Sequence, residues 1–275
     1  MKIQHATHPD DLAALNGQDL RNRFLNQDLF TPGEVRLTYT HHDRMVLGGA
    51  VPAVGEWLAL PVPAELRSES FCERRELAVV AVAGASRVRA DGQEWELSKG
   101  DVLYLGRGAA DIAFSGTEAD SALFLASALA HVSHPHTLVT LADADATAAG
   151  ETETANKRTI YKHLQPGGVP TAQLVLGITA LEPGSVWNSM PPHLHDRRTE
   201  AYLYFDLPES HRIQHFMGRP DELRTLTMSN LNLVVSPSWS VHFGAGTSNY
   251  AFVWVMAGEN QAFTDMDQVA ICDLC

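Results

Sequence analysis

Cysteine, basic charge and long apolar runs are all scarce in this 275-residue chain. Three cysteines are too few for a disulfide framework, which fits a reducing compartment. No apolar run reaches the ~18 residues that a membrane helix needs, and the first residues do not resemble a signal peptide. The 20 Lys and Arg residues are outnumbered by 33 Asp and Glu residues, and a net charge of -13 repels nucleic-acid phosphates. These absences predict a cytoplasmic protein that binds neither membranes nor nucleic acid.

The rest of the composition is that of a soluble globular protein, with 45% hydrophobic and 19% charged residues. The length allows one large domain or two smaller ones. A helical pattern covers residues 10–25, where Leu20 and Phe24 share one face. Asp10 or Asp11 is the expected N-cap, and Gly17 is a point at which this helix can split.

Short strands are expected from residue 35 onward, separated by turn signals such as Asp91-Gly92. The first set covers residues 35–39, 45–51, 77–82, 86–90, 94–97, 102–105, 109–114 and 123–129, and the second covers residues 172–179, 213–217, 224–228, 231–235 and 250–256. Residues 141–156 are small and acidic, without Lys or Arg, and are expected to form a linker. We therefore predict an all-β fold with minor helix: two β-barrels in tandem, in domains 1–145 and 157–275.

Two histidines one residue apart mark the most informative stretch. On an extended chain the side chains of His193 and His195 share a face, while Leu194 points away. The polar, turn-forming residues 196–199 then allow the chain to fold back, so that Glu200 reaches the same point from a neighbouring strand. Two imidazoles and a carboxylate suit a divalent first-row metal ion.

The best candidate for a fourth ligand is His242, which follows the apolar strand at residues 231–235 and a Pro-containing turn. A His-x-His pair, a following Glu and a distant His resemble the double motif of the cupin barrel, whose members bind metal with three His and one Glu. The alternative is that His193 and His195 are surface-loop histidines, and His242 in its expected context argues against it. Residues 73–77 occupy a comparable place in the first half without imidazoles, so the first barrel is expected to bind no metal.

A closer resemblance runs along nearly the whole chain. The matching tracts resemble the 4-deoxy-L-threo-5-hexosulose-uronate ketol-isomerase family, and they lie at residues 20–22, 73–77, 197–202, 217–220, 236–242, 246–250 and 258–267. The resemblance implies tandem cupin-type barrels (a bicupin), with one Zn²⁺ per subunit bound by His193, His195, Glu200 and His242. It also implies a cytoplasmic homo-oligomer, a hexamer, that acts in pectin and uronate degradation.

The implied reaction is an aldose–ketose isomerisation of a small keto-uronate. It converts 5-dehydro-4-deoxy-D-glucuronate into 3-deoxy-D-glycero-2,5-hexodiulosonate through an enediolate, and a bound metal ion stabilises the negative charge of that enediolate. Tyr202 shares the inward face with Glu200 and is the candidate catalytic group. Its alternative role is packing inside the barrel.

Three basic residues are candidates for holding the substrate carboxylate: Arg158, Lys162 and Arg219. The alternative for the run around Arg158 and Lys162 is a solvated, charged edge strand. Trp239 is a candidate wall of the substrate site, with an ordinary core position as its alternative.

Two other functions fit the same ligand set. One is an Fe(II)-dependent cupin dioxygenase, which oxygen consumption would reveal. The other is a non-catalytic sugar-binding or storage cupin, and the retention of all four ligands argues against it. No helix-turn-helix pattern suggests a sugar-responsive regulator.

Overall fold

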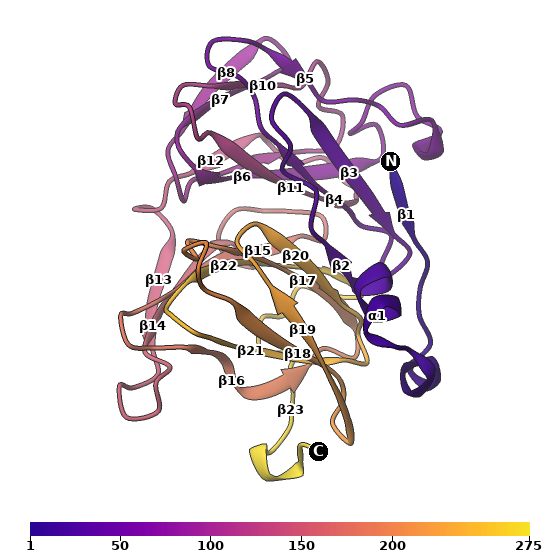
Figure 1. Ribbon diagram of the computed structural model, residues 1–275. Coiled ribbons are helices and arrows are strands. Elements are labelled where there is room, and N and C mark those ends of the chain that lie inside the picture. The colour runs from indigo at the N-terminus through magenta and orange to yellow at the C-terminus, as the bar shows by residue number, and fades with distance from the viewer. The chain divides into compact units, whose positions relative to one another are not determined.

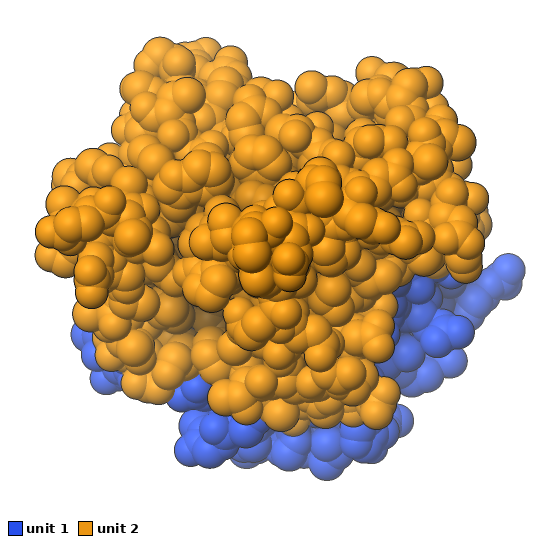
Figure 2. Space-filling model, turned by 90° about the horizontal axis from the view of Figure 1, so that it is seen from below, with its two compact units in different colours: residues 1–4, 28–144, 163–175 blue, residues 5–27, 145–162, 176–275 orange.

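The computed structural model describes all 275 residues, and nearly all of its regular structure is β-strand (Figure 1). Contacts divide the chain into two compact units, which Figure 2 colours blue and orange. Unit 1 comprises residues 1–4, 28–144 and 163–175, and unit 2 comprises residues 5–27, 145–162 and 176–275. The predicted all-β class with minor helix is confirmed. None of the helical segments has the length and apolar character needed to cross a membrane.

Unit 1 contains two sheets, with strand orders β1-β3-β4-β11-β6-β9-β12 and β5-β10-β7-β8. Its elements are β1 (Lys2–Gln4), β3 (Val35–Thr40), β4 (Val46–Ala50), β5 (Leu58–Ala59), η2 (Ala64–Leu66), β6 (Arg75–Ala83), β7 (Ser86–Ala90), β8 (Gln93–Leu97), β9 (Val102–Leu105), β10 (Ala113–Gly116), β11 (Ala122–Leu129) and β12 (Thr137–Val139). The alternation of side chains along β6 places Leu77, Val79 and Ala81 together in an apolar core, which Phe114 joins from the second sheet.

Unit 2 also contains two sheets, with strand orders β13-β14-β15-β22-β17-β20-β2 and β19-β18-β21-β16-β23. Its elements are η1 (Pro9–Ala14), α1 (Gly17–Phe24), β2 (Leu25–Asn26), β13 (Asp145–Ala149), β14 (Arg158–Leu164), β15 (Val175–Leu181), β16 (Trp187–Leu194), β17 (Arg198–Phe205), β18 (Ile213–Arg219), β19 (Glu222–Met228), β20 (Asn232–Ser236), β21 (Val241–Gly246), β22 (Ala251–Gly258), β23 (Asp267–Gln268) and η3 (Ile271–Asp273).

The two units repeat one strand order. In the larger sheets β3-β4-β11-β6-β9 corresponds to β14-β15-β22-β17-β20, and in the smaller sheets β5-β10-β7-β8 corresponds to β16-β21-β18-β19. By this correspondence β6 of unit 1 occupies the place of β17 in unit 2.

The helical region begins differently from the prediction. Asn16 caps α1, since its side-chain oxygen accepts hydrogen bonds from the backbone N–H groups of Gln18 and Asp19 at 2.9 and 3.0 Å. His8 caps η1, so the predicted caps Asp10 and Asp11 are wrong. An Asn directly before a helix satisfies N–H groups that would otherwise lack partners.

The observed units are not contiguous in sequence, unlike the predicted domains 1–145 and 157–275. Residues 5–27 belong to unit 2 because β2 pairs with β20, with Leu25 opposite Val234. The expected linker at residues 141–156 contains β13, which pairs with β14. Pairing between segments as distant in sequence as β2 and β20 leaves no local signal.

Candidate metal centre

The four predicted ligands come together in unit 2. Strands β16 and β21 are antiparallel neighbours, and His193 lies opposite His242 in their register. His195 lies in the turn that follows β16, and Glu200 is supplied by β17 of the other sheet. The ligands thus converge from both sheets of the unit.

The ligand atoms of His193, His195, Glu200 and His242 all lie within 4.8 Å of one another. The centroid of the His193 ring lies 4.9 Å from that of His195 and 4.8 Å from that of His242. Three of the four side chains are buried, and His193 is partly exposed. This geometry is compact enough for one ion to touch all four ligand atoms.

Backbone carbonyls orient two of the imidazoles. Nδ1 of His195 lies 3.0 Å from the carbonyl oxygen of Asp265, and Nδ1 of His242 lies 3.3 Å from that of Ser240. A ring whose Nδ1–H donates to a carbonyl presents a lone pair at Nε2, which is the arrangement that metal-binding histidines adopt. Nε2 of His242 is buried without a hydrogen-bond partner, although it lies 2.7 Å from Oε2 of Glu200. Two ligand atoms held this close together fit a shared cation.

The pKa values of two of the ligands also favour metal binding. Burial, followed by the neighbouring His242, lowers the pKa of His193 to about 3, so its imidazole is neutral. Burial raises the pKa of Glu200, but the effects of His242 and His195 outweigh it and leave that pKa well below its usual range. Neutral imidazoles and an ionised carboxylate are the forms that bind metal ions.

Three of the ligands, His193, His195 and Glu200, line a cavity of about 240 Å³ in unit 2. Its polar wall includes Arg158, Thr179, Ser189, Tyr202 and Gln268, and its apolar wall includes Ile160, Phe252, Trp254, Phe263 and Met266. Room for a small organic molecule therefore lies directly beside the ligand cluster.

Comparison with known proteins shows the family of the chain. The model of the KduI/IolB family matches residues 26–271. The chain belongs to the KduI/IolB family. It is 49% identical over 274 residues to a 4-deoxy-L-threo-5-hexosulose-uronate ketol-isomerase of Cereibacter sphaeroides, covering 100% of this chain and 98% of the relative. It is 46% identical over 279 residues to a protein of the same name in Kineococcus radiotolerans, with complete coverage of both. The predicted family resemblance is confirmed.

Solved structures with this fold are more distant in sequence. An IolB-like protein of Salmonella typhimurium has a TM-score of 0.72 at 18% identity, covering 90% of this chain and 96% of that one. An oxalate decarboxylase of Bacillus subtilis has a TM-score of 0.54 at 12% identity, covering 79% and 70% of the two chains. These likenesses support the fold of this KduI/IolB family member.

Tyr202 reaches the cavity from β17, two residues after Glu200. Its hydroxyl lies 2.8 Å from Oγ of Ser189, and its ring centroid lies 5.4 Å from that of His242. Burial, together with the charge of Glu200, raises the pKa of Tyr202 well above its usual value. The phenol is therefore neutral at physiological pH and available as a hydrogen-bond donor.

Arg158 enters the same cavity from β14. Its guanidinium donates to the carbonyl oxygens of Asn156, at 2.8 Å, and Met190, at 3.4 Å, and it forms no ion pair. Burial lowers its pKa, although the side chain stays cationic as arginine does in proteins. The cavity thus contains a positive charge that no carboxylate of the protein neutralises.

The other predicted substrate contacts do not line this cavity. Lys162 forms an ion pair with Asp145 at 3.1 Å, and Arg219 forms ion pairs with Asp221 and Asp10 at 3.2 and 3.6 Å. Trp239 donates its indole N–H to the carbonyl of Thr7 and packs edge-on against Phe24. Each of the three side chains has partners elsewhere in unit 2.

The sequence reasoning missed the segment that closes the site. The carbonyl of Asp265 meets His195 and also accepts a hydrogen bond from Nη2 of Arg198 at 2.7 Å. The carboxylate of Asp265 pairs with Arg197 and accepts from Asn260. The signal was present, because residues 258–267 were among the tracts that resemble the family, but no role followed from their spacing.

Proposed function

We propose that this protein is a metal-dependent ketol-isomerase that converts 5-dehydro-4-deoxy-D-glucuronate into 3-deoxy-D-glycero-2,5-hexodiulosonate. The observation that carries the proposal is a cluster of three histidines and one glutamate beside a cavity that also contains Arg158 and Tyr202. Relatives that are 44–49% identical to this chain, and that it matches along 98–100% of their length, are named ketol-isomerases.

Zinc is the proposed metal, at one ion per subunit. Three neutral imidazoles and one carboxylate are a typical zinc donor set, with first-row neighbours such as iron and manganese as competitors. A bound divalent ion supplies Lewis-acid stabilisation of negative charge on substrate oxygens.

Arg158 is the proposed anchor of the substrate carboxylate. A guanidinium can donate two parallel hydrogen bonds to a carboxylate, and this one forms no ion pair within the protein. A single fixed contact of this kind orients a flexible uronate so that its other end faces the ligand cluster.

Tyr202 is the proposed hydrogen-bond donor to the substrate oxygen on which negative charge develops. Aldose–ketose isomerisation moves a proton from one carbon to its neighbour through an enediolate. A neutral phenol beside the ligands stabilises the negative charge of that enediolate by donating a hydrogen bond. Ser189, at 2.8 Å, holds the hydroxyl in place.

The remaining parts of the proposal follow from the family resemblance. They are tandem cupin barrels, a hexameric assembly, and a cytoplasmic role in pectin and uronate degradation. The repeated strand order of the two units supports the tandem arrangement. Light scattering of the purified protein measures the assembly directly.

The reaction itself is tested by incubating the purified protein with 5-dehydro-4-deoxy-D-glucuronate and following products by NMR, with oxygen consumption recorded in parallel. The proposal predicts the ketose product and no oxygen uptake. Oxygen-dependent product would instead indicate a dioxygenase, and unchanged substrate would indicate a binding protein.

A further inference from the structure

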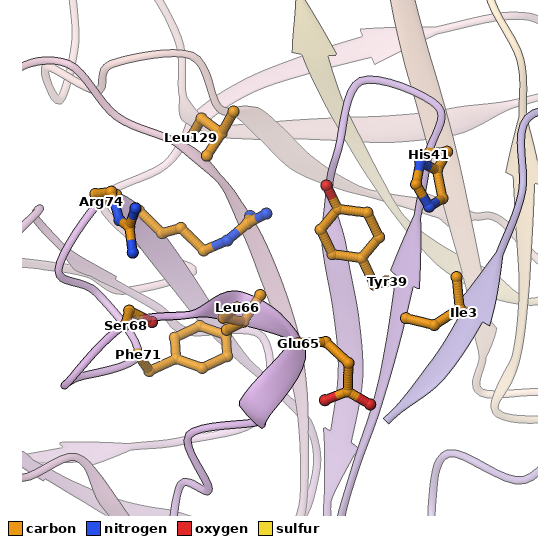
Figure 3. A pocket seen from close by; sticks show the side chains of 10 residues that line it. Ile3, Tyr39, His41, Glu65, Leu66, Ser68, Phe71, Arg74 and Leu129 are labelled. Carbon is orange, nitrogen blue, oxygen red and sulfur yellow. The ribbon is translucent and has the colours of Figure 1, made fainter.

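Unit 1 contains a second cavity, of about 370 Å³, outside the metal centre. Figure 3 shows Arg74 and Ser68 on one side and Ile3 and His41 on the other, with Tyr39 between them. Its size lies in the range of small-molecule sites in proteins.

Arg75 is a buried cation among the residues that line this cavity. It is only 4% exposed, yet it forms no ion pair. Its Nη2 donates to the carbonyl of Arg44 at 2.6 Å, its Nη1 lies 3.5 Å from that of Ser127, and its guanidinium lies 5.6 Å from the centre of the Tyr39 ring. Carbonyls and a ring face satisfy donors but leave the positive charge without a counter-charge, which is costly in a buried place.

The other charged residues of the cavity do not neutralise Arg75. Glu65 is about half exposed and lies 3.9 Å from the amino group of Met1. Arg74 adds a second cation at the rim, where it pairs with Glu73 at 3.3 Å. The interior of the cavity therefore favours an anion.

Arg75 lies at the edge of the apolar core of unit 1, where a charged side chain can face the cavity. It begins β6 and shares the face of Leu77, Val79 and Ala81, which form the core, so it lies where the apolar interior of unit 1 ends. Strand β17, which occupies the same place in unit 2, presents Glu200 and Tyr202 to the metal centre. In the strand registers Arg75 corresponds to Arg198, because each begins its strand and pairs with the last residue of the neighbouring strand, whereas Leu77 stands in the place of Glu200.

The walls indicate which anion fits. Leu66, Phe71, Leu129 and the ring of Tyr39 are apolar surfaces, and Ser68 and the Tyr39 hydroxyl add polar contacts. Inorganic phosphate would leave those apolar surfaces unused. A carboxylate attached to a compact carbon framework would use both the guanidinium and the walls.

We propose that this cavity is a second ligand site, which binds a small organic carboxylate of about the size of a hexuronate through Arg75. The site does not depend on the metal centre or on the proposed reaction. Unit 1 lacks the ligand cluster of unit 2, yet through this site it binds a ligand of its own.

Isothermal titration calorimetry with D-glucuronate tests the proposal. The background is a His242→Ala, Arg158→Met chain, which removes the metal ligand and the carboxylate anchor of unit 2. We expect one D-glucuronate bound per chain, with D-glucose and inorganic phosphate at least about tenfold weaker. Phosphate binding as tightly as D-glucuronate, or no saturable D-glucuronate binding, would overturn the proposal.

Variants locate the site. Arg75→Met in the same background should weaken binding at least about tenfold. Because a buried arginine also supports folding, Leu129→Trp is the second variant: Leu129 is 37% exposed, so a larger side chain there blocks the cavity without disturbing the core. Arg87→Met, which removes an equal charge from the exposed Arg87–Glu94 pair, should bind normally. Unchanged binding in both Arg75→Met and Leu129→Trp would place the ligand elsewhere and refute the assignment.

Discussion

Nε2 of His242 lies 2.7 Å from Oε2 of Glu200, and the two side chains are only 1% and 4% exposed. The other nitrogen of His242 lies 3.3 Å from the carbonyl oxygen of Ser240, and a ring that donates its proton there presents a lone pair to Glu200. A lone pair and a carboxylate oxygen at this distance repel each other unless one cation binds both. The close approach of His242 to Glu200 is therefore a structural reason to expect a metal ion at this site.

Removing His242 tests that reason. We expect His242→Ala to lose metal binding and isomerase activity while remaining folded, because the apolar core of unit 2 does not depend on this side chain. Mass spectrometry of native protein measures the metal, and circular dichroism measures the fold. His136→Ala is a matched control, since His136 pairs with Asp91 in unit 1. Full metal content in His242→Ala would remove His242 from the ligand set.

Tyr202→Phe removes a hydroxyl while keeping the ring that packs in the barrel. We expect kcat to fall by about 10²-fold with metal content unchanged, because the hydrogen bond to the developing oxyanion is lost. Tyr204→Phe is the control: its hydroxyl lies 2.8 Å from Nδ1 of His215 and does not line the cavity. Equal kcat values in the two variants would show that Tyr202 only packs.

Arg158→Met should raise KM for the keto-uronate by about 10- to 100-fold, which corresponds to the free energy that a charge-assisted hydrogen bond usually contributes. The metal content should stay unchanged. Arg158→Lys should recover part of the loss, since a lysine keeps the charge but not the bidentate geometry. Lys162→Met and Arg219→Met should leave KM near its original value, because both cations already pair with carboxylates. A KM increase confined to Lys162→Met or Arg219→Met would move the carboxylate site.

Glu76 should matter for stability rather than catalysis. Its buried carboxylate accepts hydrogen bonds at 2.6 to 2.8 Å from the backbone N–H groups of Ala172, Gln173 and Leu174 and from the Tyr104 hydroxyl. Glu76→Gln should lower the free energy of unfolding in urea by about 2 to 3 kcal/mol, because an amide N–H₂ then faces donors. Tyr104→Phe removes one neutral donor and should cost only about 1 kcal/mol. A loss for Glu76→Gln no larger than that for Tyr104→Phe would contradict this account.

Three of the four predicted ligands, His193, His195 and Glu200, could be found because their spacing is local. Two histidines separated by one residue share a strand face, and a short polar turn returns the chain to Glu200. His242 is distant in sequence from the other three ligands, and the resemblance to the double motif of the cupin barrel was needed to select it.

The surroundings of the site could not be predicted in the same way. Whether a cation binds substrate depends on which carboxylates are near it, and Asp145, opposite Lys162 in the register of β13 and β14, is 17 residues away in sequence. The contact between Asp265 and His195 spans 70 residues. The grouping of residues 5–27 with unit 2 depends on the distant pairing of β2 with β20.

The most direct test of the account is a titration of metal against turnover. The purified protein is stripped with a chelator, zinc is returned in measured amounts, and isomerisation of 5-dehydro-4-deoxy-D-glucuronate is assayed at each step. We predict that activity disappears on stripping and returns in proportion to zinc, reaching its maximum near one ion per chain. Full turnover by the stripped protein would contradict the central claim that the cluster of His193, His195, Glu200 and His242 acts through a bound metal ion.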